Sequence, residues 1–202
     1  MVLDIERVIA DSYKNFHTRG FDYICLYRSP EWTQKIYTFD GDVAKLPEVI
    51  NPHDHRYDFT TTCLYGAVEN RWYNTLGHKK RDPVYQKFEY RTPLNGGNGF
   101  SWVGEQRLRE LRRETFRPGL GTASYGMGYN EIHTIKICRS GTILGLNQYA
   151  DIVPLDKPTT TYCHDSEPPS LTGLYDKFTA DEILKKLAIV KEKVPAFELP
   201  VM

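Results

Sequence analysis

The sequence predicts a mainly β domain in which short antiparallel strands form a sandwich or a barrel, with one helix at each end of the chain. Short segments rich in aromatic residues follow one another, and turn residues separate them. No helical crossover lies between these segments, as a parallel βαβ arrangement would require. Helical periodicity of apolar residues is confined to the two ends of the chain.

Periodicity and capping residues define the two predicted helices. Residues 3–18 carry apolar side chains at helical spacing, and the segment runs into Gly20, which we interpret as a stop signal. Residues 180–193 follow a capping box made of Thr179 and Glu182, in which each residue satisfies a backbone N–H of the first turn. We therefore expect an N-terminal helix and a C-terminal helix.

Between the helices the sequence predicts strands wherever β-branched and aromatic residues lie between turn signals. The predicted strands are residues 23–27, 32–39, 57–65, 68–76, 84–91 and 132–137. The segment 105–116, rich in arginine and glutamate, suits an exposed strand, with a helix as the alternative. We expect a single domain over residues 1–202, with the barrel at about 21–155 and the second helix in a C-terminal extension.

Composition excludes several classes of partner. Lysine plus arginine and aspartate plus glutamate both number 26, so no net field steers the chain to nucleic acid or anionic lipid. The N-terminus lacks the basic and apolar stretches of a signal peptide, and no segment is apolar enough to span a bilayer. The cysteines show no metal-binding spacing, so we expect buried, reduced thiols in a cytoplasmic protein. They are Cys25, Cys63, Cys138 and Cys163.

Three histidines form the candidate metal site. His53 and His55 lie two residues apart at the start of a predicted strand, so their side chains point to the same side. His133 stands at the start of another predicted strand. Three neutral imidazoles on one face of an ion leave positions open opposite them, as a catalytic site requires. A chance His-x-His pair is the alternative, and the other histidines, His17, His78 and His164, lie in unrelated polar contexts.

The same residues resemble the first motif of the cupins, a family of small β-barrels. That motif is a His-x-His pair, an acidic residue and a closing glycine, here His53, His55, Asp58 and Gly66. A glycine turn at 117–119 before the strand of the third histidine is similar to the second motif. The usual glutamate is replaced by a closer aspartate, so the resemblance implies a three-histidine site.

Within the cupins, residues 23–149 are similar to the thiol dioxygenases, which include the cysteine and cysteamine dioxygenases. The shared segments are 52–55 and 63–66. The resemblance implies that Tyr149 is catalytic, that Asn147 stands in a substrate-side position held by histidine in the family, and that Arg28 grips a substrate carboxylate. It also implies an Fe(II) cofactor and addition of both atoms of dioxygen to a small thiol.

Other roles and other classes stay open at this point. Asp58 is a fourth ligand, an acceptor that fixes a ligand imidazole, or a turn carboxylate; we favour the second. Tyr57, Phe59 and Trp72 are expected to line the pocket, with Tyr57 touching the substrate. Zn, Ni or Mn could replace iron in a cupin isomerase, epimerase or decarboxylase, where the metal acts as a Lewis acid. A non-catalytic barrel that binds a small molecule is the third class.

The expected partners are therefore a small-molecule substrate and, for a dioxygenase, dioxygen. Nucleic acid and membranes are not expected. The amphipathic terminal helices could cover a sheet edge or join two protomers, so a homodimer is a further expectation.

Overall fold

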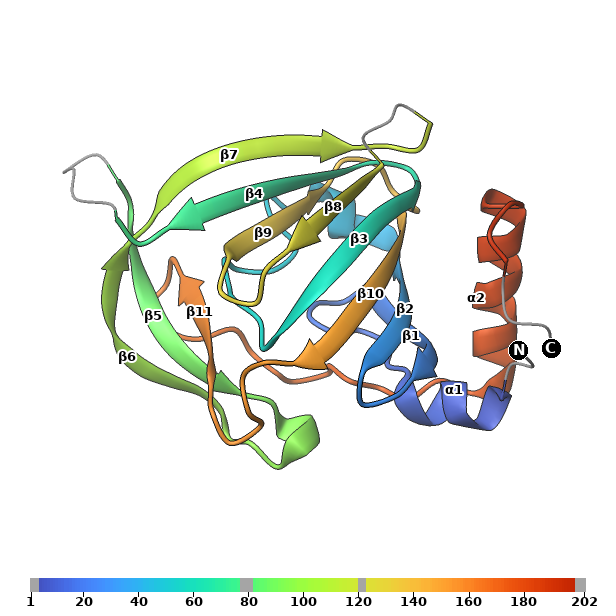
Figure 1. Ribbon diagram of the computed structural model, residues 1–202, viewed down its shortest axis with the longest axis horizontal. Coiled ribbons are helices and arrows are strands. Elements are labelled where there is room, and N and C mark those ends of the chain that lie inside the picture. The colour runs from blue at the N-terminus through green and yellow to red at the C-terminus, as the bar shows by residue number, and fades with distance from the viewer. Residues whose placement is uncertain (1–3, 77–81, 120–122, 199–202) are drawn as a thin grey trace.

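The structure, a computed structural model that describes residues 4–76, 82–119 and 123–198, consists mainly of antiparallel strands with a helix near each end (Figure 1). The predicted fold class, mainly β with two terminal helices, is confirmed. The helices are α1 (Ile5–Asp11) and α2 (Ala180–Lys193), and the strands are β1 (Phe21–Arg28), β2 (Trp32–Phe39), β3 (Tyr57–Tyr65), β4 (Val68–Asn74), β5 (Val84–Arg91), β6 (Gly99–Arg107), β7 (Arg109–Phe116), β8 (Ser124–Met127), β9 (Ile132–Ile137), β10 (Ile143–Asp151) and β11 (Thr159–Cys163).

Two sheets face each other. The first has the strand order β1-β2-β10-β3-β8. The second consists of the groups β7-β4-β9 and β11-β5-β6, which the segment around His53 joins. His53 forms antiparallel bridges with His133 of β9 on one side and with Thr161 of β11 on the other. A residue that sequence analysis assigned to a metal site thus also holds the second sheet together.

The strand order is that of a jelly roll. Strands β2-β10-β3-β8 face the series formed by the segment 49–53, β9, β4 and β7. The pairing within the described residues leaves sheet edges, so the predicted barrel takes the form of two facing sheets rather than a closed ring. The hairpin of β5 and β6 extends the second sheet away from the helices (Figure 1).

The main core lies between the two sheets. Its fully or nearly fully buried members come from both of them and alternate along each strand with residues of the opposite face. Among them are Phe39, Cys63, Val68, Ile137 and Leu144. Some members of this core, including Phe59 and Leu144, also line a cavity between the sheets.

A second core lies between the helices and the outer face of the first sheet. Ile183, Leu187 and Val190 of α2 pack there with Ile24 and Ile36. The apolar face of α2 therefore covers the sheet, as its periodicity indicates.

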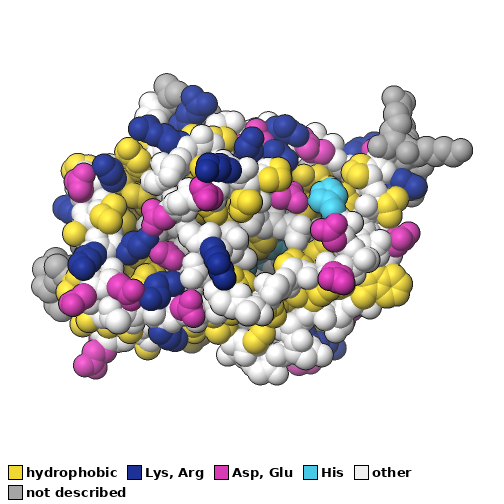
Figure 2. Space-filling model, turned by 180° about the vertical axis from the view of Figure 1, so that it is seen from behind, with side chains coloured by type: hydrophobic (Ala, Val, Ile, Leu, Met, Phe, Trp, Pro, Cys, Tyr) yellow, Lys and Arg dark blue, Asp and Glu magenta, His cyan; other side chains and the backbone are white. Residues whose placement is uncertain are grey.

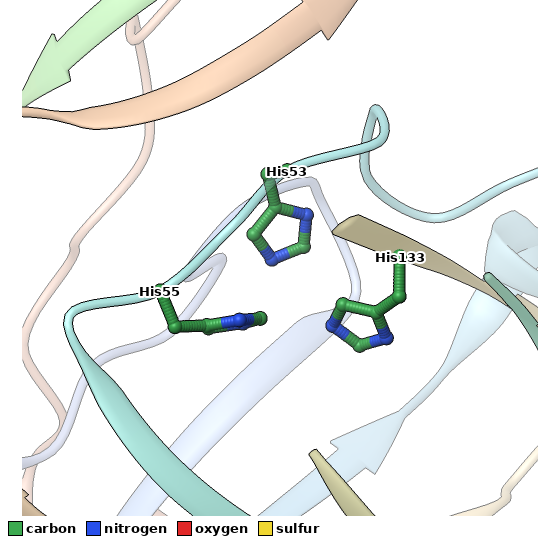
Figure 3. Close-up of side chains that lie close together, drawn as sticks. All are labelled: His53, His55 and His133. Carbon is green, nitrogen blue, oxygen red and sulfur yellow. The ribbon is translucent and has the colours of Figure 1, made fainter. Parts of the chain in front are cut away.

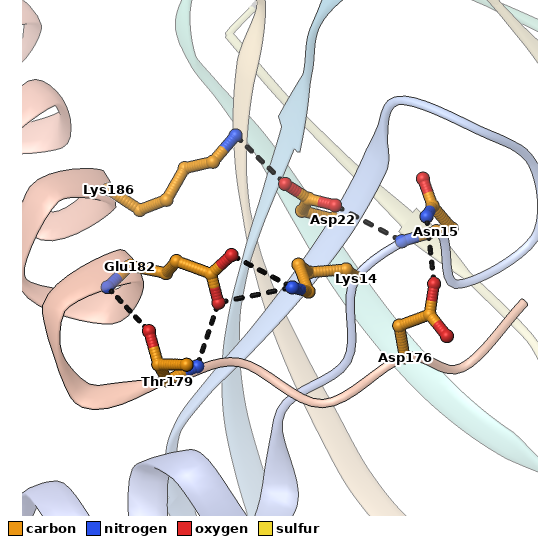
Figure 4. A network of polar contacts seen from close by, with 7 residues as sticks. All are labelled: Lys14, Asn15, Asp22, Asp176, Thr179, Glu182 and Lys186. Atoms are coloured by element: carbon orange, nitrogen blue, oxygen red, sulfur yellow. Dashed lines mark hydrogen bonds and ion pairs between the residues drawn. The ribbon is translucent and has the colours of Figure 1, made fainter.

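Polar contacts fix the start of α2 against the N-terminal segment (Figure 4). Thr179 and Glu182 form the predicted capping box. The Lys14 ammonium donates to the Glu182 carboxylate at 2.9 Å, and Lys186 lies 2.8 Å from an Asp22 carboxylate oxygen. The predicted C-terminal helix is confirmed with its expected bounds.

Several elements differ from the prediction. The first helix ends at Asp11 rather than near residue 18, because the Ser12 hydroxyl accepts the Cys25 N–H and Tyr13 pairs with Tyr23 as a β-bridge. The strand predicted for 68–76 ends at Asn74. The segment 105–116 is extended, as predicted, and is shared between β6 and β7. Strands β8, β10 and β11 and residues 99–104 of β6 were not predicted.

Surface features agree in part with the composition. Lys and Arg are interspersed with Asp and Glu over the face in Figure 2, so this face carries no large patch of one sign.

All four cysteines are free, as expected, but Cys138 is exposed, and the prediction of burial is wrong for it. Within the described residues, neither helix has the length and apolar character needed to cross a bilayer.

Candidate metal centre

His53, His55 and His133 converge at one point between the sheets (Figure 3). Their ring centroids are 4.6 Å apart for His53 and His55, and 5.0 Å apart for each of the other two pairs. One potential ligand atom of each residue lies within 4.8 Å of those of the other two. This separation is close enough for the three imidazoles to share one metal ion.

The backbone explains why the three meet. His53 and His133 are directly paired in the second sheet, and each N–H donates to the carbonyl of the other at 3.0 Å. Directly opposite residues of an antiparallel pair carry their side chains on the same face. The His55 N–H donates to the Tyr129 carbonyl at 2.9 Å, which holds His55 beside the approach to β9. His53 and His55 precede β3 rather than lying within it, but their imidazoles face one point as predicted.

Hydrogen bonds set which nitrogen faces the shared point. His53 Nδ1 lies 2.9 Å from the Asn51 carbonyl, and His133 Nδ1 lies 2.6 Å from Asn70 Oδ1. A carbonyl only accepts, so each Nδ1 carries the proton and each Nε2 keeps its lone pair for a metal. His55 Nδ1 is buried and has no hydrogen-bond partner among the described residues, so a metal ion could satisfy it.

The three imidazoles are neutral at neutral pH, because burial lowers their pKa values. Burial lowers the pKa of His53 to about 4, although its bond to the Asn51 carbonyl works in the opposite direction. Burial also lowers the pKa of His55 and of His133 well below the ordinary value, and the neighbouring histidines add to this effect. Metal binding requires the neutral form, so these residues fit a metal of the kind that imidazole prefers, namely Zn, Cu, Fe or Ni.

The histidines line a cavity of about 850 Å³ between the sheets. Several aromatic side chains line it, and Phe59 packs edge-on against His55 with ring centroids 4.7 Å apart. The aromatic lining includes Phe16, Tyr23, Tyr37, Tyr57, Phe59 and Tyr125. A volume of this size holds a small organic molecule.

Of the predicted substrate residues, Arg28 and Tyr57 line the cavity. Arg28 donates to the Tyr23 hydroxyl at 2.7 Å and lies 3.8 Å from an Asp11 carboxylate oxygen. Burial raises the pKa of Tyr57 to about 12, so its hydroxyl stays protonated at neutral pH. Both side chains are placed where a substrate could meet them, and their roles stay predictions.

Asn147 and Tyr149 are not among the lining residues. Strand alternation turns Leu146 and Gln148 toward the cavity, and their neighbours Asn147 and Tyr149 therefore face the other way. The Tyr149 side chain is 46% exposed. The structure does not bring these two residues to the histidines, and the roles that the resemblance implied for them stay untested.

Asp58 and Trp72 also lie away from the point where the histidines meet. Asp58 Oδ1 accepts the Tyr129 N–H at 2.7 Å and so fixes the loop before β9. The atoms that accept from ligand imidazoles are instead the Asn51 carbonyl and the Asn70 side chain. Trp72 is buried in the core, with the Arg112 guanidinium 4.0 Å above its ring, rather than in the cavity wall.

Three residues of the site were not identified from the sequence. The sequence pattern does not mark Asn70 as a site residue, because a single polar residue is common in a strand of mixed polarity. His17 was assigned to an unrelated context, but it lines the cavity with its ring centroid 6.4 Å from that of His53. Lys35 lines the cavity as well, and its alternation with Thr33 and Tyr37 is the signal that could have found it.

The two other histidines lie elsewhere. His164 packs against Tyr85 with ring centroids 4.4 Å apart and is not part of the metal group. His78 lies outside the described residues.

Comparisons with known proteins add little beyond this geometry. No protein-family model and no curated protein matches the chain. Similar solved structures include FeII HppE, with 12% identity, a TM-score of 0.40 and coverage of 74% of this chain and 60% of that one. Another is hydroquinone 1,2-dioxygenase from Sphingomonas sp. TTNP3 with 4-hydroxybenzoate bound, with 11% identity, a TM-score of 0.40 and 75% of both chains covered. KdgF from Halomonas sp. has 12% identity, a TM-score of 0.36 and coverage of 64% and 79%. At these values the likeness carries no weight for function.

Proposed function

We propose that this protein is a non-haem iron dioxygenase in which His53, His55 and His133 hold Fe(II) and a small thiol-containing substrate binds in the adjoining cavity. The observation that carries the proposal is the meeting of three neutral imidazoles at the wall of a cavity, with no carboxylate in the group that the described residues form. When bound, a ferrous ion would supply the electron chemistry that activates dioxygen and would make a coordinated thiol more acidic.

The ligand set favours an anionic substrate group. Three neutral imidazoles leave the double positive charge of the ion uncompensated, whereas a carboxylate ligand would offset part of it. A thiolate is a soft anion that suits such an ion. The donor set therefore supports a thiol more than it supports a neutral alcohol.

The cavity wall supplies the remaining requirements. Aromatic side chains form part of the wall around the histidines and offer apolar contacts to a bound molecule. The Tyr57 ring centroid lies 5.8 Å from that of His55, and its protonated hydroxyl can donate a hydrogen bond to a bound molecule. We propose Tyr57 and Arg28 as residues that orient the substrate.

The first experiment measures the metal. The protein is purified aerobically and after anaerobic loading with iron, and bound metals are quantified by mass spectrometry. We expect about one iron per chain, lost in His53→Ala and in His133→Ala. His164→Ala is the matched control, because it removes a histidine outside the group. Wild-type protein that binds no metal after loading would refute the proposal.

The second experiment measures oxygen. Iron-loaded protein is mixed with a panel of small thiols, and dioxygen uptake is followed together with formation of the sulfinic acid. We expect uptake that depends on both the thiol and the three histidines. Metal binding without uptake for any thiol would exclude a thiol dioxygenase.

The size of the cavity favours one alternative. About 850 Å³ is more room than a small thiol needs, and it would admit a sugar or a larger organic acid. A metal that acts as a Lewis acid in an isomerase, epimerase or decarboxylase would use the same three histidines. Turnover that proceeds equally well without dioxygen would identify this class.

A further inference from the structure

Lys35 is a buried lysine in the wall of the cavity. It comes from β2, its exposed fraction is 4%, and it lines the same space as the three histidines. Its ammonium nitrogen lies 4.9 Å from the centre of the Tyr57 ring and 5.2 Å from the centre of the Tyr23 ring. Two aromatic faces therefore flank the ammonium group and keep water from it.

This ammonium has few partners for a buried charge. Its one hydrogen bond within the described part of the chain is to the Tyr57 hydroxyl at 3.4 Å. An ammonium has three N–H donors, so two of them have no described acceptor. Buried charges are usually paired, because an uncompensated one costs several kcal/mol.

Other lysines of the protein show the usual arrangement. Lys14 pairs with Glu182 at 2.9 Å, and Lys186 pairs with Asp22 at 2.8 Å. Both are more exposed than Lys35, yet each has a carboxylate. For Lys35 no carboxylate oxygen within 4.0 Å is found among the described residues, and the Asp151 carboxylate, which also lines the cavity, acts on it only over a longer distance.

Arg28 is less suited than Lys35 to bind an anion inside the cavity. Its side chain is 45% exposed and is already engaged with the Tyr23 hydroxyl and, at 3.8 Å, with Asp11. Exposure to water weakens any further ion pair that it could make. Lys35 has the opposite properties, since it is buried, makes one long hydrogen bond and lines the same cavity as the histidines.

We infer that Lys35 binds the carboxylate of an organic-acid substrate, so that the molecule held at the histidines carries an anionic group at its other end. The inference rests on the proposed function, because it assigns the second anchor of the same substrate. A carboxylate would accept the two remaining ammonium protons, and the flanking tyrosine rings would exclude competing water. Lys35 thereby selects acids over neutral molecules of the same shape.

The test compares each acid with its neutral amide, which has the same shape and no charge. Benzoate and benzamide are titrated into metal-free protein by isothermal calorimetry at pH 6, where Lys35 is protonated because its pKa is about 7. The pair 3-mercaptopropionate and 3-mercaptopropionamide is titrated into protein loaded with Co(II), which reports thiol binding without turnover. The variants are Lys35→Met, which removes the charge, and Lys35→Arg, which retains it. Lys136→Met is the control, because Lys136 is a strand lysine that does not line the cavity.

We expect wild-type protein to prefer the acid in both pairs by roughly tenfold or more, the contribution of a charge-assisted hydrogen bond. Lys35→Met should abolish this preference, whereas Lys35→Arg and Lys136→Met should retain most of it. An equal preference in Lys35→Met, or no preference in the wild-type protein for either pair, would overturn the inference. The benzoate pair needs neither metal nor oxygen, so its result stands even where the protein shows no dioxygenase activity.

Discussion

Replacing Lys35 with methionine should stabilise the protein, although the change removes a polar group from the candidate site. Burial is the largest cause that lowers the pKa of Lys35, from 10.5 to about 7, and the Arg28 charge adds to it. The folded state therefore binds the Lys35 proton more weakly than the unfolded state does. Methionine fills a similar volume without a charge, so the cost disappears.

The magnitude follows from the linkage between protonation and folding. Between pH 7 and 10.5 the unfolded state binds one more proton than the folded state, so the free energy of unfolding rises with pH across this window. A pKa difference of about 3.5 units, at about 1.4 kcal/mol for each unit, means that below pH 7 the protonated Lys35 lowers the free energy of unfolding by about 5 kcal/mol. The rings of Tyr23 and Tyr57 stabilise the cation by about 0.5 to 2 kcal/mol each. The two rings together offset about 1 to 4 kcal/mol of this cost, so we expect a net gain of about 1 to 4 kcal/mol in Lys35→Met at pH 6.5.

The assay is urea unfolding of metal-free wild type, Lys35→Met and Lys136→Met at pH 6.5, 8 and 9.5. The advantage of Lys35→Met should be largest at pH 6.5 and should shrink as the pH rises, because the wild-type lysine loses its proton. Lys136→Met should show no such trend. A Lys35→Met protein that is less stable than wild type at pH 6.5, or an advantage independent of pH, would refute the reasoning.

Three further changes test the site and the fold. Asn70→Leu removes the acceptor of His133 Nδ1 and should weaken metal binding by about 10- to 100-fold in competition with a chromophoric chelator; unchanged affinity would contradict the assigned tautomer. Gly66→Ala should lower the free energy of unfolding in urea by about 1 to 3 kcal/mol, because the φ of Gly66 is +82° and a Cβ there would lie 2.9 Å from the Thr142 Cα. The control Gly126→Ala should lower it far less, because no atom lies within 4 Å of the added Cβ. Thr179→Ala removes the cap of α2 and should cost about 1 kcal/mol in the same assay, and equal stability would mean that the cap contributes nothing.

The sequence predicted those elements whose signal is local. Strands β2, β3, β5 and β9 have the expected bounds because each is a run of β-branched or aromatic residues that ends at a turn. Strand β10 was missed because Gly145 interrupts its apolar pattern. Its partner strands come from distant parts of the chain, and no local pattern reports them.

The same distinction applies to the site. His53 and His55 were found because two residues two apart on an extended chain share a face, and His133 was found by its place at the start of a strand. His17 and Asn70 reach the site only through tertiary packing, from a loop and from a different strand. The roles inferred for Asn147 and Tyr149 came from the resemblance alone, and the alternation of β10 turns both away from the cavity.

The metal group and Lys35 depend on the fold in different ways. His53 bridges two strand groups, so its backbone would be held in place without any ion, and the protein should fold before it binds metal. Lys35 makes no such structural contribution, because its charge costs free energy in the folded state. A residue that lowers stability in this way is typical of a binding or catalytic site, where the cost is offset only when a ligand is present. Carboxylate binding should therefore stabilise wild-type protein more than Lys35→Met in thermal unfolding, and equal stabilisation of the two proteins would show that the buried charge serves no ligand of this class.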